Sequence, residues 1–275
     1  MYRISPFTPL FFNPSTDQYG AASKYVQIFA PTDQILIEVI AVSEYREIKG
    51  AVIDAVNESE TAIDWSVWVM NDTTILYYYV LSGLKSGFYY LDINDAQSEL
   101  FRVTDDTKEL AKTTLIQYSM KDNKQRRDGV FWISEKQYFF DFRAPGGFKD
   151  DNWTFGVANE QFVTIEEDLV DLYSIETTQK SFTLGNSIGC PVWYAELLNR
   201  IMSCSYVYFD NQRYVRKDGS VPEKSQEIEN LRSYIFNMIL QEVKHVDKTE
   251  SDNLLKIRRV EGTAYRLVEN KLLIV

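Results

Sequence analysis

Cysteine and histidine are scarce in this sequence, and their scarcity limits the chemistry that the chain can perform. Cys190 and Cys204 are the only cysteines, and His245 is the only histidine. A metal cluster that needs two imidazoles therefore cannot be built within one chain. A serine triad would have to use His245, but this residue lies in the polar run EVKHVDK, and no G-x-S-x-G elbow occurs. The pattern indicates a surface histidine rather than a catalytic base.

The two cysteines lie on either side of a predicted helix. A regular helix rises about 1.5 Å per residue, which would place the two sulfurs about 20 Å apart, far beyond disulfide reach. We therefore expect free thiols in a reducing compartment. Cys190 also precedes a helix, where the helix dipole can lower a thiol pKa and favour a nucleophile. The surrounding IGCPVW is apolar, which favours a small buried residue instead.

Long apolar runs and an excess of positive charge are also missing. No run approaches 18 apolar residues, and MYRISPFTPLFF lacks the charged start and long apolar core of a signal peptide, so we expect no membrane insertion. The net charge is −11 and the pI is near 4.8, so the average field repels phosphates and we expect no nucleic-acid binding. The basic run 121–127, KDNKQRR, contains an aspartate and indicates a solvated loop.

Aromatic residues, in contrast, are abundant. They make up 14% of the chain, with 18 Tyr and 16 Phe, and such residues favour the half-buried surface of a sheet and anchor protein interfaces. Residues 25–42 alternate around the turn APTDQ and predict a hairpin. Turn signals then separate further short strands, which predicts an antiparallel sandwich for residues 1–105. These strands are expected at 51–56, 64–70, 74–81, 87–93 and 98–103.

A second β-rich domain is predicted for residues 106–275, after the charged, turn-rich segment 104–112. The C-terminal residues 254–275 predict a three-strand meander with turns at Glu261-Gly262 and Glu269-Asn270. The fold class is thus mainly β, with an antiparallel sandwich followed by a β-rich assembly domain that carries one or two short helices. The strands expected before the first helix lie at 113–119, 129–134, 137–144, 160–165 and 168–175.

The clearest helix is predicted at 191–204. Pro191 suits the first helical turn, where its missing N–H has no intrahelical partner. Apolar residues recur at helical spacing along one face: Trp193, Leu197, Leu198, Ile201 and Met202. The polar segment 224–233 is a second candidate helix. Residues 234–243, YIFNMILQEV, fit either a helix or a buried strand.

A polar segment with one proline and two glycines, RAPGGFKDDNW at 143–153, predicts a long loop. Loops of this kind can hold a partner, so it is a candidate assembly loop. The residues expected to make contacts are Arg143, Pro145, Phe148 and Trp153.

Acidic pairs and a glycine-containing segment are further candidate sites, but neither pattern indicates a specific chemistry. Three pairs of adjacent acidic residues could in principle support glycoside cleavage or bind calcium: Asp105/Asp106, Asp150/Asp151 and Glu166/Glu167. Adjacent residues on a strand point to opposite faces, so we interpret each pair as a solvated face or turn. The segment 185–189, GNSIG, matches neither the P-loop nor G-x-G-x-x-G, and a tight entry to the helix is the favoured interpretation over a phosphate cradle. We predict no cofactor, no metal and no catalytic residue.

Flat aromatic rings can stack on sugars, which makes a carbohydrate-binding module the alternative function. The candidate glycan or partner contacts are Trp65, Trp68, Tyr77 and Tyr79. Trp65 and Trp68 are three positions apart, so on one strand they face opposite sides and one of them is expected in the core. An enzyme, either a glycosidase or a thiol-dependent hydrolase, is the third hypothesis.

Two stretches carry a family resemblance: SELFRVTDDTKELAKTTLIQYSMKDN at 98–123, and the run from FTLGNSIGC through RKDGSVPE at 182–223. Together they resemble structural proteins encoded in the tail or neck gene clusters of tailed phages and prophages of gut bacteria. The chain is similar to distal tail hub proteins of long-tailed phages, with ring proteins of crAss-like phages as a second match. The likeness covers residues 87–275.

The resemblance implies a non-enzymatic virion protein, made in the bacterial cytoplasm and built into the phage tail or neck. Its β-rich core would assemble into a homo-oligomeric ring that contacts other tail or neck proteins, with an added domain facing outward and able to meet a host surface glycan. No ring-forming motif can be matched residue by residue, so the ring symmetry is not transferred.

Overall fold

The computed structural model describes most of the chain, which divides into two units. Residues 1–242 form one compact unit, and residues 243–275 form another. Both are built of strands, with antiparallel pairing nearly throughout, which confirms the expected mainly β fold class. The described residues are 2–12, 25–42, 47–120, 129–133, 136–185, 187, 189–217, 219–228, 233–243, 258–260, 263–268 and 271–274.

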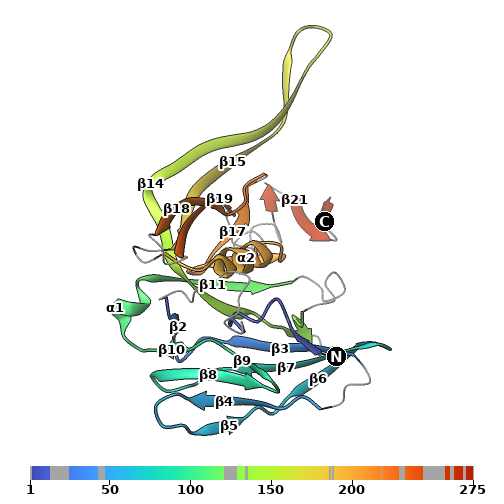
Figure 1. The fold of residues 1–275 in the computed structure, drawn as a ribbon. Helices are drawn as coiled ribbons and strands as arrows, with labels where there is room; N and C mark the ends of the chain where they lie inside the picture. The colour runs from blue at the N-terminus through green and yellow to red at the C-terminus, as the bar shows by residue number, and fades with distance from the viewer. Residues whose placement is uncertain are drawn as a thin grey trace. The chain divides into compact units, whose positions relative to one another are not determined.

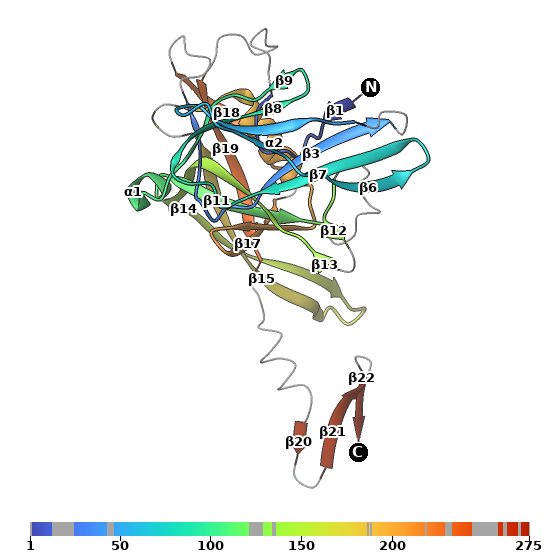
Figure 2. The ribbon, with the colours of Figure 1, turned by 90° about the horizontal axis from the view of Figure 1, so that it is seen from below.

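Two sheets form the N-terminal sandwich (Figures 1 and 2). The first has the order β1-β3-β7-β6, with β1 Tyr2–Ile4, β3 Ile35–Val42, β7 Thr74–Leu81 and β6 Ser66–Asn71. The second has the order β2-β10-β8-β4-β5, with β2 Gln27–Phe29, β10 Phe101–Val103, β8 Gly87–Ile93, β4 Gly50–Asp54 and β5 Glu60–Ala62. The short β9, Ala96–Gln97, pairs with β8.

The sandwich core follows the two-residue period of its strands. Ile37 and Val39 from one sheet and Leu91 and Ile93 from the other are fully buried in a single cluster. Alternate residues of a strand point to the same face, so each strand supplies its apolar face to the space between the sheets. This packing follows the alternation that predicted the sandwich.

The predicted hairpin over 25–42 is wrong, because its two strands join different sheets. β2 pairs in parallel with β10, whereas β3 pairs with β1 and β7. Between them the backbone N–H of Ala30 donates to the Asp33 carboxylate at 2.7 Å. This turn carries the chain from one layer to the other instead of folding it back beside itself.

The middle of the chain closes into a barrel. The strands follow the order β15-β14-β11-β16-β17-β19, and pairing of β15 with β19 joins the two ends of this series. The strand bounds are β11 Thr113–Ser119, β14 Phe140–Val163, β15 Leu169–Leu184, β16 Tyr206–Phe209, β17 Gln212–Arg216 and β19 Ser233–Glu242. β18, Glu223–Ile228, extends this sheet beside β19, and β12 Trp132–Ile133 pairs with β13 Lys136–Gln137.

Helix α2, Val192–Ile201, packs on the barrel core and confirms the predicted helix with an end three residues earlier. Pro191 is its N-cap. Leu198 and Ile201 are fully buried in the same cluster as Phe142 and Phe182 of the barrel. The helix therefore contributes its apolar stripe to the core. A second, shorter helix, α1 Thr107–Leu110, lies between β10 and β11 and was not predicted from sequence.

The second helix predicted at 224–233 is wrong. Residues 223–228 form β18, which pairs with β19, and 229–232 lie outside the described residues. Of the two alternatives for residues 234–243, helix or buried strand, the structure shows a strand, which is β19 up to Glu242. Phe236, Met238 and Leu240 are buried at every second position, as expected of a strand. Pairing with this buried strand overrides the helical propensity of the polar segment.

The C-terminal unit contains a three-stranded antiparallel sheet, as predicted. Its strands are β20 Arg258–Val260, β21 Thr263–Val268 and β22 Lys271–Ile274, in that order. The two predicted turn pairs lie outside the described residues. In the described parts of the chain, neither helix has the length and apolar character needed to span a membrane.

Candidate functional site

The hairpin of β14 and β15 extends far beyond the barrel that holds its base (Figure 1). β14 pairs with β11 only from Phe140 to Pro145, and β15 pairs with β19 only from Gln179 to Leu184. Residues 153–178 therefore form a two-stranded ribbon in which each strand pairs only with the other. We call this ribbon the arm.

Large apolar side chains are exposed along the arm on both of its faces. Phe155 is 66% exposed and Val157 61%, and both lie on the face that also carries Trp153, because they alternate along β14. Ile175 pairs with Ala158 on the opposite face and is 60% exposed. Further exposed apolar residues are Phe162, Val163, Ile165, Leu169 and Leu172. Exposed apolar side chains gathered on one projecting element make the arm a candidate interaction surface.

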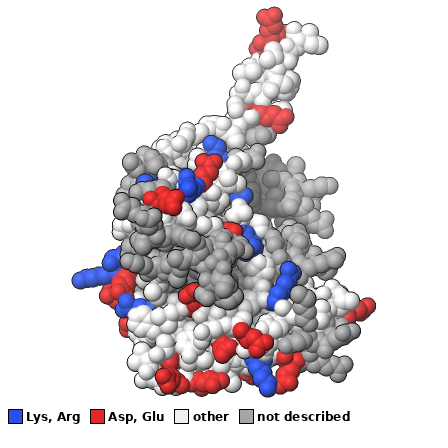
Figure 3. Space-filling model, in the orientation of Figure 1, with Lys and Arg blue, Asp and Glu red and all other residues white. Residues whose placement is uncertain are grey.

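The arm is also acidic. From Trp153 to Gln179 the sequence has no Lys, Arg or His. Figure 3 accordingly shows white and red atoms along the projecting ribbon. The acidic residues are Glu160, Glu166, Glu167, Asp168, Asp171 and Glu176. The surface that fits this arm should therefore combine apolar contact area with positive charge.

The tip of the arm is a tight turn from Thr164 to Asp168. The Thr164 N–H donates to the Asp168 carbonyl at 2.8 Å, and the Asp168 N–H donates to the Thr164 hydroxyl at 3.1 Å. Glu167 takes a positive φ of 66° to close it. Ile165 is fully exposed at this tip. Local hydrogen bonds thus hold an apolar side chain out in solvent.

The base of the arm is fixed by Lys180. Its ammonium lies 3.0 Å from the Glu242 carboxylate of β19 and 4.5 Å from the centre of the Trp153 ring. Partial burial opposes the charge, but hydrogen bonds to Glu242 and Tyr214 outweigh it and raise the Lys180 pKa. The cation therefore stays charged and ties β15, β19 and Trp153 together where the arm leaves the barrel.

The loop predicted at 143–153 is wrong, since these residues belong to β14. Arg143 and Pro145 pair with β11 in the barrel, and Phe148 stacks on Tyr214 at 4.7 Å against the barrel core. Of the four candidate contact residues, Trp153 alone reaches the arm. The proline and glycines that suggested a loop are in regular pairing, Pro145 with Thr113 of β11, and Gly146 and Gly147 with Leu184 and Thr183 of β15. The register shift of β14 comes after them, between Phe148 and Trp153.

The four candidate glycan contacts pack against core clusters. Tyr77 is 8% exposed within the sandwich core, and Trp65 and Tyr79 pack against the same cluster. Trp68 packs against a smaller cluster around Leu76. The structure therefore does not gather these rings into one exposed platform, although sugar binding by this domain stays a prediction that a glycan array can test.

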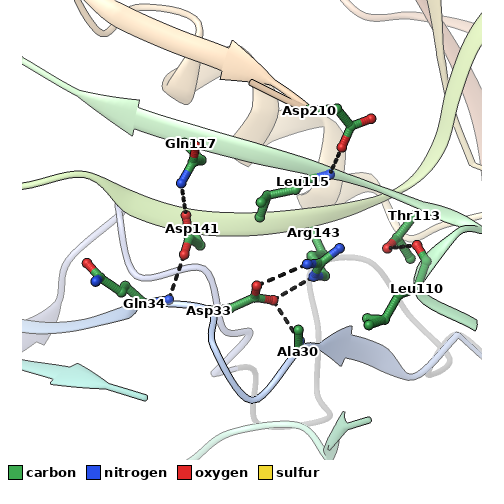
Figure 4. Close-up of polar contacts among 10 residues, drawn as sticks. All are labelled: Ala30, Asp33, Gln34, Leu110, Thr113, Leu115, Gln117, Asp141, Arg143 and Asp210. Atoms are coloured by element: carbon green, nitrogen blue, oxygen red, sulfur yellow. Dashed lines mark hydrogen bonds and ion pairs between the residues drawn. The ribbon is translucent and has the colours of Figure 1, made fainter. Parts of the chain in front are cut away.

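The sandwich and the barrel are joined by a buried polar contact (Figure 4). The Arg143 guanidinium donates to both Asp33 oxygens, at 2.6 and 3.1 Å. The Asp141 carboxylate accepts the Gln34 N–H at 2.7 Å and the Gln117 amide at 3.0 Å. Burial raises the pKa of Asp141, and these hydrogen bonds oppose that shift. The contact fixes the two halves of this unit to each other.

The nucleophile interpretation of Cys190 does not fit its surroundings. Both cysteines are free, as expected, and Cys190 is fully buried. Burial raises its pKa, which is the opposite of what a reactive thiol needs. Gly185 and Gly189 take positive φ values of 97° and 74°, which supports a tight entry to α2. Asn186 of that segment lies outside the described residues.

The remaining candidates do not converge on a reaction centre. Among the described residues, no three His, Cys, Asp or Glu side chains are grouped to hold a metal. Asp106 instead caps α1 by accepting the Lys108 N–H at 2.8 Å. His245 and residues 121–127 lie outside the described part of the chain.

A cavity of about 320 Å³ lies between the N-terminal segment and α2. Phe11 stacks on Trp193 in its wall with ring centres 4.9 Å apart. Glu196 and Arg200 supply its charged groups, and Arg200 already donates to the Pro6 carbonyl at 2.8 Å. The cavity thus has a mixed apolar and polar lining, and the cation in its wall is already hydrogen-bonded within the chain.

Comparison with protein-family models, with curated proteins and with solved structures finds no match for this chain. Sequence reasoning predicted strands at 160–165 and 168–175 but missed that they form one free ribbon. The available signal was the run of apolar and acidic residues between Lys149 and Lys180 without a basic residue.

Proposed function

We propose that this chain is a non-enzymatic structural protein of a phage virion, a ring-forming component of the tail or neck that assembles through its arm. The supporting observation is the ribbon of residues 153–178, which presents apolar side chains on both faces. An isolated two-stranded hairpin is marginally stable in water, so such an arm gains most by docking on another molecule.

The barrel suits this role because it holds the arm rigidly. The two arm strands continue into the barrel wall, and Lys180 and Trp153 brace the point where they leave it. Pre-organised contact elements lose little entropy on binding. The sequence resemblance to tail and neck proteins supplies the setting, namely a virion built in the bacterial cytoplasm.

The proposal is tested by the mass of the purified full chain. We expect light scattering after size exclusion to give a defined oligomer, and negative-stain images to show discrete rings. Replacing Phe155 and Ile175 by Ser should convert this oligomer to monomer, because both side chains are exposed in the monomer and their loss removes apolar contact area only in the assembly.

A matched control is Val56→Ser, which removes a 72% exposed apolar side chain from a sandwich turn and should leave the oligomer intact. Unchanged urea midpoints would show that the arm variant still folds. A wild-type chain that stays monomeric at high concentration, and that also fails to bind purified tail-tube protein, would contradict the proposal.

A further inference from the structure

The C-terminal sheet is too small to stand alone. Its three strands span residues 258–274 within a 33-residue unit, Val243–Val275. Domains below about 40 residues usually need disulfides, metals or oligomerisation to be stable. This unit contains no cysteine. A surface contributed by another element or molecule is therefore the expected source of its stability.

The charge of this sheet is opposite to that of the arm. β20, β21 and β22 contain Arg258, Arg259, Arg266 and Lys271 and no acidic residue. The whole unit has seven basic and five acidic residues in a chain whose net charge is −11. Between the basic positions the strands are apolar, as in YRLV and KLLI. The sheet thus has the composition that the arm requires of its partner.

We propose that the arm of one copy docks on the C-terminal sheet, β20–β22, of a second copy of this chain. Acidic and apolar residues of the ribbon would meet basic and apolar residues of the sheet, so the contact is complementary in charge and covers apolar side chains on both sides. This inference rests on the proposed assembly function and names the surface that the arm recognises.

Such a contact is heterologous, because it joins two different surfaces of identical chains. Each copy has one arm and one C-terminal sheet, so every copy can both give and receive a contact. Repetition of a heterologous contact closes a ring when the rotation between copies allows it. The same pairing therefore explains how one arm per chain is sufficient for a closed assembly.

Charge reversal in the full chain tests the pairing. The arm variant is Glu160→Lys, Glu166→Lys and Asp171→Lys, and the sheet variant is Arg258→Glu, Arg259→Glu and Arg266→Glu. Each alone should weaken assembly by about tenfold or more, because like charges then meet in the contact. A chain with both sets of reversals should recover rings.

Mixing the two single variants gives the sharpest result. In this mixture the reversed arm meets the reversed sheet, and the unchanged arm of the sheet variant meets the unchanged sheet of the arm variant. Both contacts between unlike chains are therefore complementary, and light scattering should show mixed oligomers that contain the two variants in equal numbers. Matched control reversals at the exposed sandwich residues Glu60, Asp64 and Asp72 should leave the wild-type rings intact.

The outcomes separate this inference from the proposed function. If arm substitutions abolish rings but the sheet variant assembles as the wild type does, the C-terminal sheet is not the partner and the assembly function stands. Failure of the doubly reversed chain to recover rings, or of the mixture to form mixed oligomers, would also overturn the inference. A monomeric wild type would overturn both proposals.

Discussion

Arg143 and Asp33 form the ion pair at the contact between the sandwich and the barrel. The two side chains are 12% and 2% exposed, and the guanidinium binds both carboxylate oxygens. Arg143→Gln should lower the free energy of unfolding by about 3–5 kcal/mol, because it leaves a buried carboxylate without its counter-charge. Urea unfolding of the purified variant measures this loss.

A more exposed ion pair provides the control for that substitution. Arg102 and Glu109 lie 3.0 Å apart with side chains about a third exposed, so Arg102→Gln should cost no more than about 1 kcal/mol. Similar losses in the two variants would show that the Arg143 pair is not energetically distinct. Adding Asp33→Asn to Arg143→Gln should recover part of the loss, since it removes the unpaired charge.

Asp141 should make stability depend on pH. Burial raises its folded-state pKa above the ordinary carboxyl value, so the folded state holds the proton more tightly than the unfolded chain. The free energy of unfolding should therefore fall as pH rises from the ordinary carboxyl pKa through the raised one. Asp141→Asn should lack this component, although it also loses one of the two hydrogen bonds that the carboxylate accepts.

The measurement is urea unfolding of the wild type and Asp141→Asn across the acidic range. The stability advantage of the wild type should shrink as pH rises through this window. A constant difference between the two proteins would show that the Asp141 pKa is the same in the folded and unfolded states.

At the scale of elements, β14 depends on Gly146 at the point where it passes from the barrel toward the arm. Gly146 has a φ of 121°, and an added Cβ would overlap the Thr183 carbonyl oxygen of β15. Gly146→Ala should cost about 2–4 kcal/mol, from the left-handed backbone and from displacement of the neighbouring strand. Thermal or urea unfolding can establish the loss.

Gly83 separates these two causes. Its φ of 74° is also positive, but nothing lies within 4 Å of a Cβ built there. Gly83→Ala should therefore show the backbone cost alone, about 1–2 kcal/mol. Equal losses of unfolding free energy at the two sites would mean that β15 moves away from the added methyl group at no measurable cost.

The sequence was informative for elements whose apolar period is regular. β11 has the predicted bounds, and α2 was found from the spacing of Leu197, Leu198 and Ile201. β14 was not found as one strand, because Pro145, Gly146 and Gly147 have the composition of a loop and only pairing with β11 and β15 makes them strand. Long-range pairing of this kind has no local signature.

At the scale of the whole molecule, the sandwich and the barrel share buried contacts that cross residue 105. Phe7 and Leu36 belong to the same core cluster as Ile116 and Phe142, and the Tyr118 hydroxyl donates to the Phe7 carbonyl at 2.7 Å. A fragment of residues 1–242 should therefore unfold in one cooperative transition. Circular dichroism at two wavelengths would detect separate transitions.

A fragment of residues 1–105 should not fold cooperatively, since it exposes Phe7 and Leu36 and leaves Asp33 without Arg143. A cooperative transition for this fragment would contradict that expectation and support an autonomous domain with the boundary predicted at 105. Sequence periodicity can place two series of strands but does not show how tightly their cores are joined, because the joining residues are far apart in the chain.

The candidate site was less predictable than the fold. Trp153 was singled out for its place in a polar segment, but its role follows from Lys180, Glu242 and Tyr214, which come from other strands. The exposure of Phe155 and Ile175 on a free ribbon depends on where β11 and β19 stop pairing. Those ends are properties of the closed barrel rather than of any local pattern.

The parallel pair of β2 and β10 affects how the chain can mature. Gln27 pairs opposite Phe101, so β2 leaves the ribosome more than seventy residues before its neighbour exists. Until then its backbone donors and acceptors are open to strands of other nascent chains, a hazard for proteins made at high copy number. We expect slow synthesis around β10 to lower the soluble yield, and coexpressed chaperones to restore it.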